Sequence, residues 1–378
     1  MRHACRGRLR VQWVRVGACL PLLAIAAACV ACGPGEAADE AVFTPELIGT
    51  AAVPLSESDE VALLGDERTA CVIDSYEGQV RCVAGEGNVV GVFGREGEGP
   101  GEFGDPTQLA RGEAGTVGVV DSDLGRFTVF EPSGAYVSDV LLPDVFQPFP
   151  SFGTTVSGVS LDYMVMLGRM SGSLMTRYDV DIASGETVRQ EESPPGPWDI
   201  ECGQIIHGIP DSAGGWAFVA CEGHLIFVGD TGDATVLRAP TYVPELPNER
   251  DVARREEELL ALNRSQGLPR TPAIDEGLER YSATPKHYYL SAGEHLFDAA
   301  NRYWVATGRD QHEWSWLDVY DNAEYVGSVR VRDRLRAFDL LRSTLVVLVD
   351  RQVGPDDGDG IPDRALDWYD IANLPFAR

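Results

Sequence analysis

The sequence is poor in positive charge. It has 31 Lys and Arg residues against 59 Asp and Glu, a formal net charge of −28, and Lys286 is its single lysine. Nucleic acid and anionic lipid surfaces repel so acidic a chain, so we exclude both as partners. The charge favours solubility and cationic partners instead.

Catalytic signatures are also lacking. The sequence has no G-x-S-x-G, H-E-x-x-H or P-loop motif, and therefore no motif of the corresponding hydrolases, metalloproteases or NTPases. Gly99, Gly101 and Gly104 do match G-x-G-x-x-G, but Asp105-Pro106 and a predicted strand follow them rather than a helix. Glutamates beside these glycines would repel a pyrophosphate. We therefore expect no nucleotide site.

Long apolar runs are missing beyond the first 32 residues, so the rest of the chain offers no membrane span of about 20 residues. The first 32 residues carry five arginines and no acidic residue, and a mainly apolar run there ends in small residues. This order is typical of a secretory leader. Removing the leader moves the formal charge from −28 to −33.

The leader ends in a pattern that resembles a bacterial lipobox. Ala-Ala-Ala-Cys29 fits it, and Cys32 is the alternative lipidation site. A third interpretation is ordinary cleavage beside two incidental cysteines. We predict a signal peptide over 1–28 and a tether over 29–42. The protein is then exported and lipid-anchored to the cell envelope, with the outer membrane, facing the periplasm or the cell surface, as the expected site.

Besides the lipobox pair Cys29 and Cys32, the predicted mature chain has four cysteines, and an even count in an exported protein indicates disulfides. Cys71 and Cys82 flank the turn SYEG symmetrically, and Cys202 and Cys221 flank PDSAGG. We predict the bridges Cys71–Cys82 and Cys202–Cys221. The alternative is a zinc set that adds His207 and His224, but its spacing matches no compact finger.

The chain contains an internal repeat. Residues 73–87 recur at 120–134, 47 residues later and without a gap, and Asp74 falls on Asp121. Short strands punctuated by turns at such a period are typical of the blades of a β-propeller. Each of these aspartates ends a strand, where Asp commonly binds the backbone of its own turn.

The strand pattern predicts an all-β fold. We expect a six-bladed β-propeller of four-stranded antiparallel blades over 43–378, with five or seven blades as alternatives. A charged, helix-like stretch predicts a helical insertion at about 246–282, before the fifth blade. The last blade has only three strands of its own, so a strand within 43–53 is expected to complete it.

The stretch GREGEGPGEFGDP, 94–106, lies between the first two predicted blades. Together with the strands that follow, it resembles the bacterial NHL-like (TolB-like) six-bladed propellers, whose exported, lipidated members are mostly binding or scaffold proteins. The resemblance covers most of the mature chain and implies a fold and little chemistry. From the residues we expect this loop to carry the chain from one blade to the next, with Phe103 packed between them.

One acidic loop suggests a metal site. Asp357, Asp359 and Asp363 lie in DDGDGIPD, and Ca²⁺ is bound by such oxygen-rich runs. The loop departs from the EF-hand pattern because Pro355 stands at the first ligand position and Leu366 at the last. The other interpretation is a solvated turn between two strands. No other cofactor is predicted.

Two functions stay open. We expect a non-catalytic, membrane-tethered propeller that binds an extracytoplasmic protein, peptide or glycan, and touches the membrane only through its lipid anchor. The alternative is a metal-dependent, lactonase-like propeller hydrolase or lyase with a site in the central channel. That alternative requires inward-pointing side chains from several blades, and Asp298, Asn301 and His295 are its candidates.

Overall fold

The structure is a computed structural model. It describes residues 41–55, 58, 60–112, 115–142, 155–157, 160–165, 176–181, 184–192, 205–211, 213–265, 269–290, 295–351 and 363–376. The predicted leader, the cysteines at 29 and 32 and most of the tether lie outside these residues, so these predictions stay untested. Within them, neither helix has the length and apolar character needed to cross a membrane.

The described strands form six sheets. Four sheets are antiparallel meanders that follow the chain order. Their strands are β3 (Val61–Leu63), β4 (Thr69–Asp74), β5 (Gln79–Ala84), β6 (Val89–Phe93); β7 (Pro106–Arg111), β8 (Val117–Asp121), β9 (Arg126–Phe130), β10 (Tyr136–Leu141); β11 (Thr155–Ser157), β12 (Ser160–Val165), β13 (Thr176–Asp181), β14 (Thr187–Glu192); and β15 (Ile205–Pro210), β16 (Trp216–Ala220), β17 (His224–Val228), β18 (Ala234–Arg238). A short 3₁₀ turn, η2 (Cys221–Gly223), joins β16 to β17.

The next sheet is an exception to the four-stranded pattern. It contains β19 (His295–Phe297), β20 (Tyr303–Thr307), β21 (Trp314–Asp321) and β22 (Glu324–Arg332), and β1 (Val42–Phe43) pairs with β22 in parallel. The expectation of six four-stranded blades is therefore wrong on this point: five sheets have four strands and this sheet has five. Its outer strand would otherwise leave backbone groups unpaired, and β1 satisfies part of that edge.

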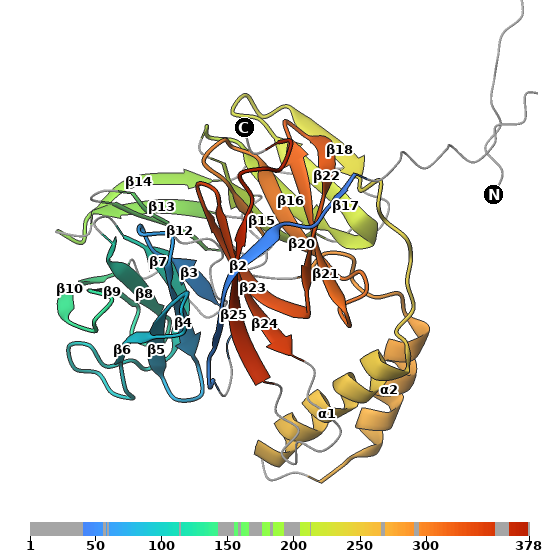
Figure 1. The fold of residues 1–378 in the computed structure, drawn as a ribbon, viewed down its shortest axis with the longest axis horizontal. Helices are drawn as coiled ribbons and strands as arrows, with labels where there is room; N and C mark the ends of the chain where they lie inside the picture. Colours follow the sequence, from blue (N-terminus) through green and yellow to red (C-terminus); the bar gives the residue numbers. More distant parts are fainter. Residues whose placement is uncertain are drawn as a thin grey trace, which may run out of the picture. The chain divides into compact units, whose positions relative to one another are not determined.

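The last sheet joins the two ends of the chain. Its order is β2 (Glu46–Ala52), β25 (Asp363–Asp370), β24 (Thr344–Arg351) and β23 (Arg334–Leu341). In Figure 1 the blue β2 lies beside the red β25, with which it pairs antiparallel. The prediction that an N-terminal strand completes the last sheet is confirmed.

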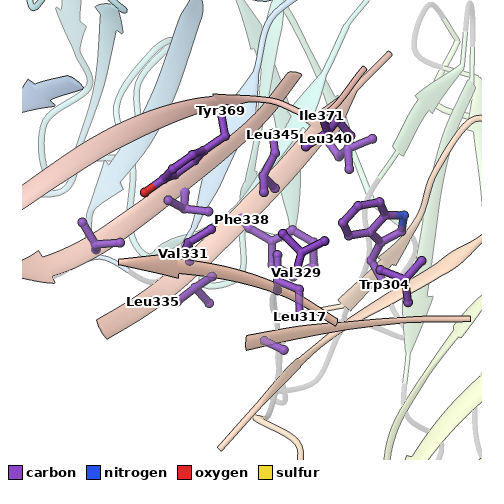
Figure 2. Packing of buried hydrophobic residues seen from close by; sticks show 14 of the residues in the cluster. Trp304, Leu317, Val329, Val331, Leu335, Phe338, Leu340, Leu345, Tyr369 and Ile371 are labelled. Carbon is purple, nitrogen blue, oxygen red and sulfur yellow. The ribbon is translucent and has the colours of Figure 1, made fainter. Parts of the chain in front are cut away.

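Neighbouring sheets pack face to face. Buried side chains of the β15–β18 sheet meet those of the β19–β22 sheet, and that sheet packs in turn on β23–β25. The series continues through β3–β5 to the β7–β10 sheet. Figure 2 shows one such layer, in which Trp304 and Leu317 lie near Phe338 and Leu345. Small antiparallel sheets that stack in this way make the chain an all-β propeller.

The internal repeat corresponds to equivalent hairpins. Asp74 ends β4 and Asp121 ends β8, and each accepts a hydrogen bond from a backbone amide three residues later in its turn. Gly78 and Gly125 close these turns with φ of 60° and 57°, a conformation that favours glycine. The predicted structural role of the two aspartates is confirmed.

The loop between the first two meanders is fixed by buried contacts. Phe103 is fully buried among residues of both sheets, as predicted. The guanidinium of Arg126 donates to the carbonyl oxygens of Glu98, Gly99 and Glu102, and the carboxylate of Asp121 accepts from two further amides of the loop. These groups are engaged within the protein, so the G-x-G-x-x-G match has a structural role.

Two helices lie between β18 and β19, at the place predicted for an insertion. They are α1 (Glu249–Ser265) and α2 (Pro272–Ala283). Figure 1 shows them side by side, in gold, outside the sheets. Each end of α1–α2 is joined to the sheets by a short connecting segment.

Candidate binding surface beside the helical insertion

The insertion lies at one end of the stacked sheets. In successive meanders, the connections between sheets and the hairpins between second and third strands fall at the same end. The β20–β21 hairpin joins the second and third strands of its meander and so lies at this end. Nε2 of His312 in this hairpin lies 2.8 Å from Nδ2 of Asn248, at the start of α1. We call the connecting segment 239–248 the stem. The stem therefore runs from β18 to this end, beside the β19–β22 sheet.

Asp318 of β21 binds the segments on both sides of the insertion through hydrogen bonds. Its carboxylate is fully buried, and its Oδ2 accepts hydrogen bonds from Thr241 Oγ1 at 2.7 Å and from the Tyr288 hydroxyl at 3.1 Å. Thr241 precedes the helices and Tyr288 follows them. Arg309 Nη2 and Ser328 Oγ donate to Oδ1 at 2.7 Å and 2.5 Å. Burial raises the pKa of Asp318, and Arg309 with the hydroxyl donors opposes that rise.

A second buried carboxylate, Asp251 in the first turn of α1, binds the same segments together. It accepts a hydrogen bond from the Asn248 amide and pairs with Arg254 at 3.0 Å and with Lys286 Nζ at 3.3 Å. Burial would raise the pKa of Asp251, but the Asn248 amide and the charges of Lys286 and Arg254 hold it below its usual value. The chain's single lysine thus joins the far end of the insertion to its beginning.

Alternating side chains on β21 and β22 form a strip next to these anchors. Trp314 and Trp316 lie on one face of β21, opposite Arg332 and Arg330 of β22. The guanidinium carbons of Arg330 and Arg332 lie 4.4 Å and 4.9 Å from the ring centroid of Trp314, and that of Arg309 lies 4.6 Å from Trp316. These are cation–π contacts. We call the five residues the Trp–Arg ladder.

The ladder presents positive charge on an acidic protein. Arg332 is exposed, and both tryptophans and Arg330 are partly exposed. Among the described residues, neither Arg330 nor Arg332 forms an ion pair with a carboxylate, and Arg330 Nε donates only to Thr44 Oγ1 at 2.8 Å. Guanidinium groups in this state retain donors for an oxyanion.

The stem adds apolar surface. Val243 and Leu246 are 68% and 56% exposed. Both lie between Thr241, which binds Asp318, and Asn248, which contacts His312, so the stem that carries them follows β21. The ladder and these two side chains together form the candidate binding surface.

The three residues predicted for a central-channel site form contacts within the protein. Asp298 accepts hydrogen bonds from two backbone amides of its own turn, from Arg302 Nε at 2.7 Å and from Trp304 Nε1 at 3.0 Å. The amide of Asn301 reaches the Asp211 carboxylate at 3.3 Å. His295 is buried with its Nδ1 2.5 Å from the Tyr303 hydroxyl, and burial lowers the pKa of His295 to about 3.

The cysteine predictions are partly tested. Cys71 and Cys82 lie opposite each other on β4 and β5 and form a disulfide, as predicted. Cys221 is also disulfide-bonded. Its predicted partner Cys202 lies outside the described residues, so that pairing stays a prediction. A thiol held in a disulfide does not ligate zinc, and His224 Nδ1 lies 3.0 Å from the Cys221 carbonyl oxygen.

The proposed calcium loop is largely outside the described residues. Asp357 and Asp359 fall in that part, and Asp363 is an exposed residue at the start of β25. In the part of the chain that the structure describes, no group of three or more His, Cys, Asp or Glu side chains is placed to hold a metal ion. The calcium prediction therefore stays untested.

Sequence reasoning missed the ladder. Its signal was the pair of alternations W-S-W and R-V-R, each of which places two like side chains on one face of a strand. The cross-strand register that brings the two pairs together is a property of the folded sheet.

Comparisons with known proteins add little. No protein-family model and no curated protein matches the chain. Among solved structures it is similar to U3-55K, with 10% identity over 85% of this chain and 99% of that chain and a TM-score of 0.48. An exported protein of Bacteroides fragilis shows 11% identity, 87% and 99% coverage and a TM-score of 0.44. Streptogramin B lyase is 8% identical over 84% of this chain and 96% of that chain, with a TM-score of 0.44. Likenesses this distant carry no argument about function.

Proposed function

We propose that this chain is a non-catalytic, lipid-anchored, six-bladed propeller of the NHL-like (TolB-like) kind that binds an extracytoplasmic protein, peptide or glycan. The candidate binding surface would make the contact, and Cys29, or alternatively Cys32, would carry the lipid. The six successive sheets of the described residues support the blade number.

The Trp–Arg ladder is the observation that carries this proposal. Arg330 and Arg332 stack on Trp314, and within the described residues neither forms an ion pair with a carboxylate. Tryptophan and arginine are the side chains that most often dominate the energy of binding surfaces. The anchors at Asp318 and Asp251 hold the stem beside them, so the surface is pre-organised.

The lactonase-like alternative requires several polar side chains that point into the channel. The contacts of Asp298 and Asn301 with their own turn and with Asp211 engage these two candidates elsewhere. Metal analysis of the purified protein, followed by a screen for lactone and ester hydrolysis, tests this alternative directly. Stoichiometric metal together with turnover would favour it over binding alone.

Photo-crosslinking in intact cells tests the binding function. A crosslinking amino acid is placed at Val243 in the stem, and the matched control carries it at Val188, which is similarly exposed, at 62%, on β14. We expect a discrete adduct from position 243 and none from position 188. The proposal is wrong if position 243 yields no adduct, or if both positions yield the same adducts.

A further inference from the structure

We propose that the candidate binding surface recognises an extended peptide segment of a partner protein, with acidic residues at alternate positions and apolar residues beside them. This inference rests on the proposed binding function and specifies its ligand. It uses the Trp–Arg ladder together with Val243 and Leu246.

The charge of the ligand follows from the arginines. A guanidinium presents a planar fork of donors that matches a carboxylate in a bidentate arrangement. Stacking on Trp314 holds the groups of Arg330 and Arg332 in place while leaving donors available. Less side-chain entropy is then lost when a carboxylate binds. The ladder therefore favours a ligand with two carboxylates.

The spacing of the ligand follows from the strand. Arg330 and Arg332 are two residues apart on β22, so their side chains leave one face about 6.6 Å apart. Alternate side chains of an extended peptide have the same separation. Adjacent acidic residues would instead point to opposite sides of the peptide, and one carboxylate would miss its arginine.

The apolar residues of the candidate binding surface favour a peptide over an acidic polysaccharide. Val243 and Leu246 are exposed on the stem and offer only hydrophobic contact. A polysaccharide chain has no aliphatic side chains to bury there, whereas a peptide supplies them beside its carboxylates. β1 occupies the β22 edge at Ser328 and Val329, next to the ladder, and the contacts that we assign to the peptide are those of the ladder side chains.

Binding of synthetic peptides to the purified mature protein tests the inference by calorimetry. One peptide alternates Asp with Leu and Ala, a second has the same composition with its Asp residues adjacent, and a polyuronate provides the polysaccharide arm. We expect the alternating peptide to bind at least about tenfold more tightly than the other two ligands. Added salt should weaken its binding.

Variants locate the site. Arg330→Gln combined with Arg332→Gln should weaken binding of the alternating peptide about tenfold or more. Arg68→Gln combined with Arg342→Gln changes the charge equally at exposed residues of other sheets, and should leave affinity within about twofold. Thermal melting of both double variants confirms that they fold. Val243→Ser combined with Leu246→Ser should also weaken binding of the alternating peptide.

The outcomes separate the two proposals. Equal affinity for both peptides, preference for the polyuronate, or unchanged binding in the Arg330/Arg332 variant would overturn this inference. A specific adduct from position 243 in cells, alongside any of those results, would leave the general binding function standing. If position 243 yields no adduct, or the same adducts as position 188, the proposed binding function itself is wrong.

Discussion

The hydroxyl of Tyr288 donates to the buried carboxylate of Asp318 at 3.1 Å, across 30 residues of sequence. Through this bond the segment that leaves α2 is attached to the middle of β21. Thr241 donates to the same oxygen from the segment that leads into α1. One carboxylate therefore controls how both ends of the insertion meet the sheet.

Tyr288→Phe should loosen the insertion. The change removes a donor from a buried carboxylate, so we expect a loss of about 1–2 kcal/mol in the free energy of unfolding, together with faster proteolysis within α1 and α2. Urea unfolding and limited proteolysis measure the two effects. Tyr76→Phe is the control because Tyr76 is 78% exposed. Equal behaviour of the two variants would contradict the role of Asp318.

Stability should fall in mild acid because of His295. Burial lowers its pKa to about 3 in the folded protein, against an ordinary value of 6.5. The neutral His295 contributes fully to stability above pH 6.5, and this contribution is lost as the pH falls. Between pH 6.5 and about pH 3 the imidazole is protonated in the unfolded chain but not in the folded chain. The loss should approach about 1.4 kcal/mol per pH unit down to about pH 3.

Urea unfolding across that pH range measures this contribution. In His295→Gln the slope attributable to the imidazole should disappear, whereas His287→Gln serves as the control that keeps it. An unchanged slope in His295→Gln would show that other groups cause the pH dependence.

The Cys71–Cys82 bridge should contribute measurably to stability. It closes a loop with a sequence separation of 11, for which chain entropy implies about 2–3 kcal/mol. We expect Cys71→Ala combined with Cys82→Ala to lower the free energy of unfolding by that amount. Reductant should lower the stability of the native protein in the same direction. Peptide mapping of the exported protein that recovers free thiols at both positions would refute the bridge.

Arg126 of β9 should be the residue on which the loop between the first two meanders depends most. Arg126→Gln leaves three carbonyl oxygens without their charged donor, so we expect a loss of about 2–4 kcal/mol. Arg95→Gln removes the exposed partner of Glu102 in the same loop and should cost less than about 1 kcal/mol. Thermal unfolding of the pair makes the comparison.

Local patterns predicted the parts of the fold that depend on nearby residues. The repeated Asp and Gly positions indicated equivalent hairpins, and the symmetric placement of Cys71 and Cys82 indicated their pairing. Phe103 could be assigned to the space between sheets because a lone aromatic in a glycine-rich loop requires burial.

Strand pairing, register and side-chain direction were beyond such reasoning. The parallel pairing of β1 with β22 occupies two residues that carry no strand pattern of their own. Asp298 was a candidate ligand by residue type, yet the fold directs Arg302 and Trp304 toward it. The ladder likewise depends on a register between β21 and β22 that neither strand specifies alone.

The pairing of β2 with β25 has a consequence for biosynthesis. Thr50 and Asp367 are hydrogen-bonded across 317 residues, so the first long strand is made well before the strand that it joins. Until the ribosome has released the end of the chain, β2 has no neighbour in its own sheet. Joining the two strands is consequently a late and slow step, because the loop to be closed is nearly the whole domain. A nascent chain truncated before β25 would leave backbone groups of β2 and β24 unpaired. Such an edge can pair with other chains, and cellular quality control would act on it before a partner binds.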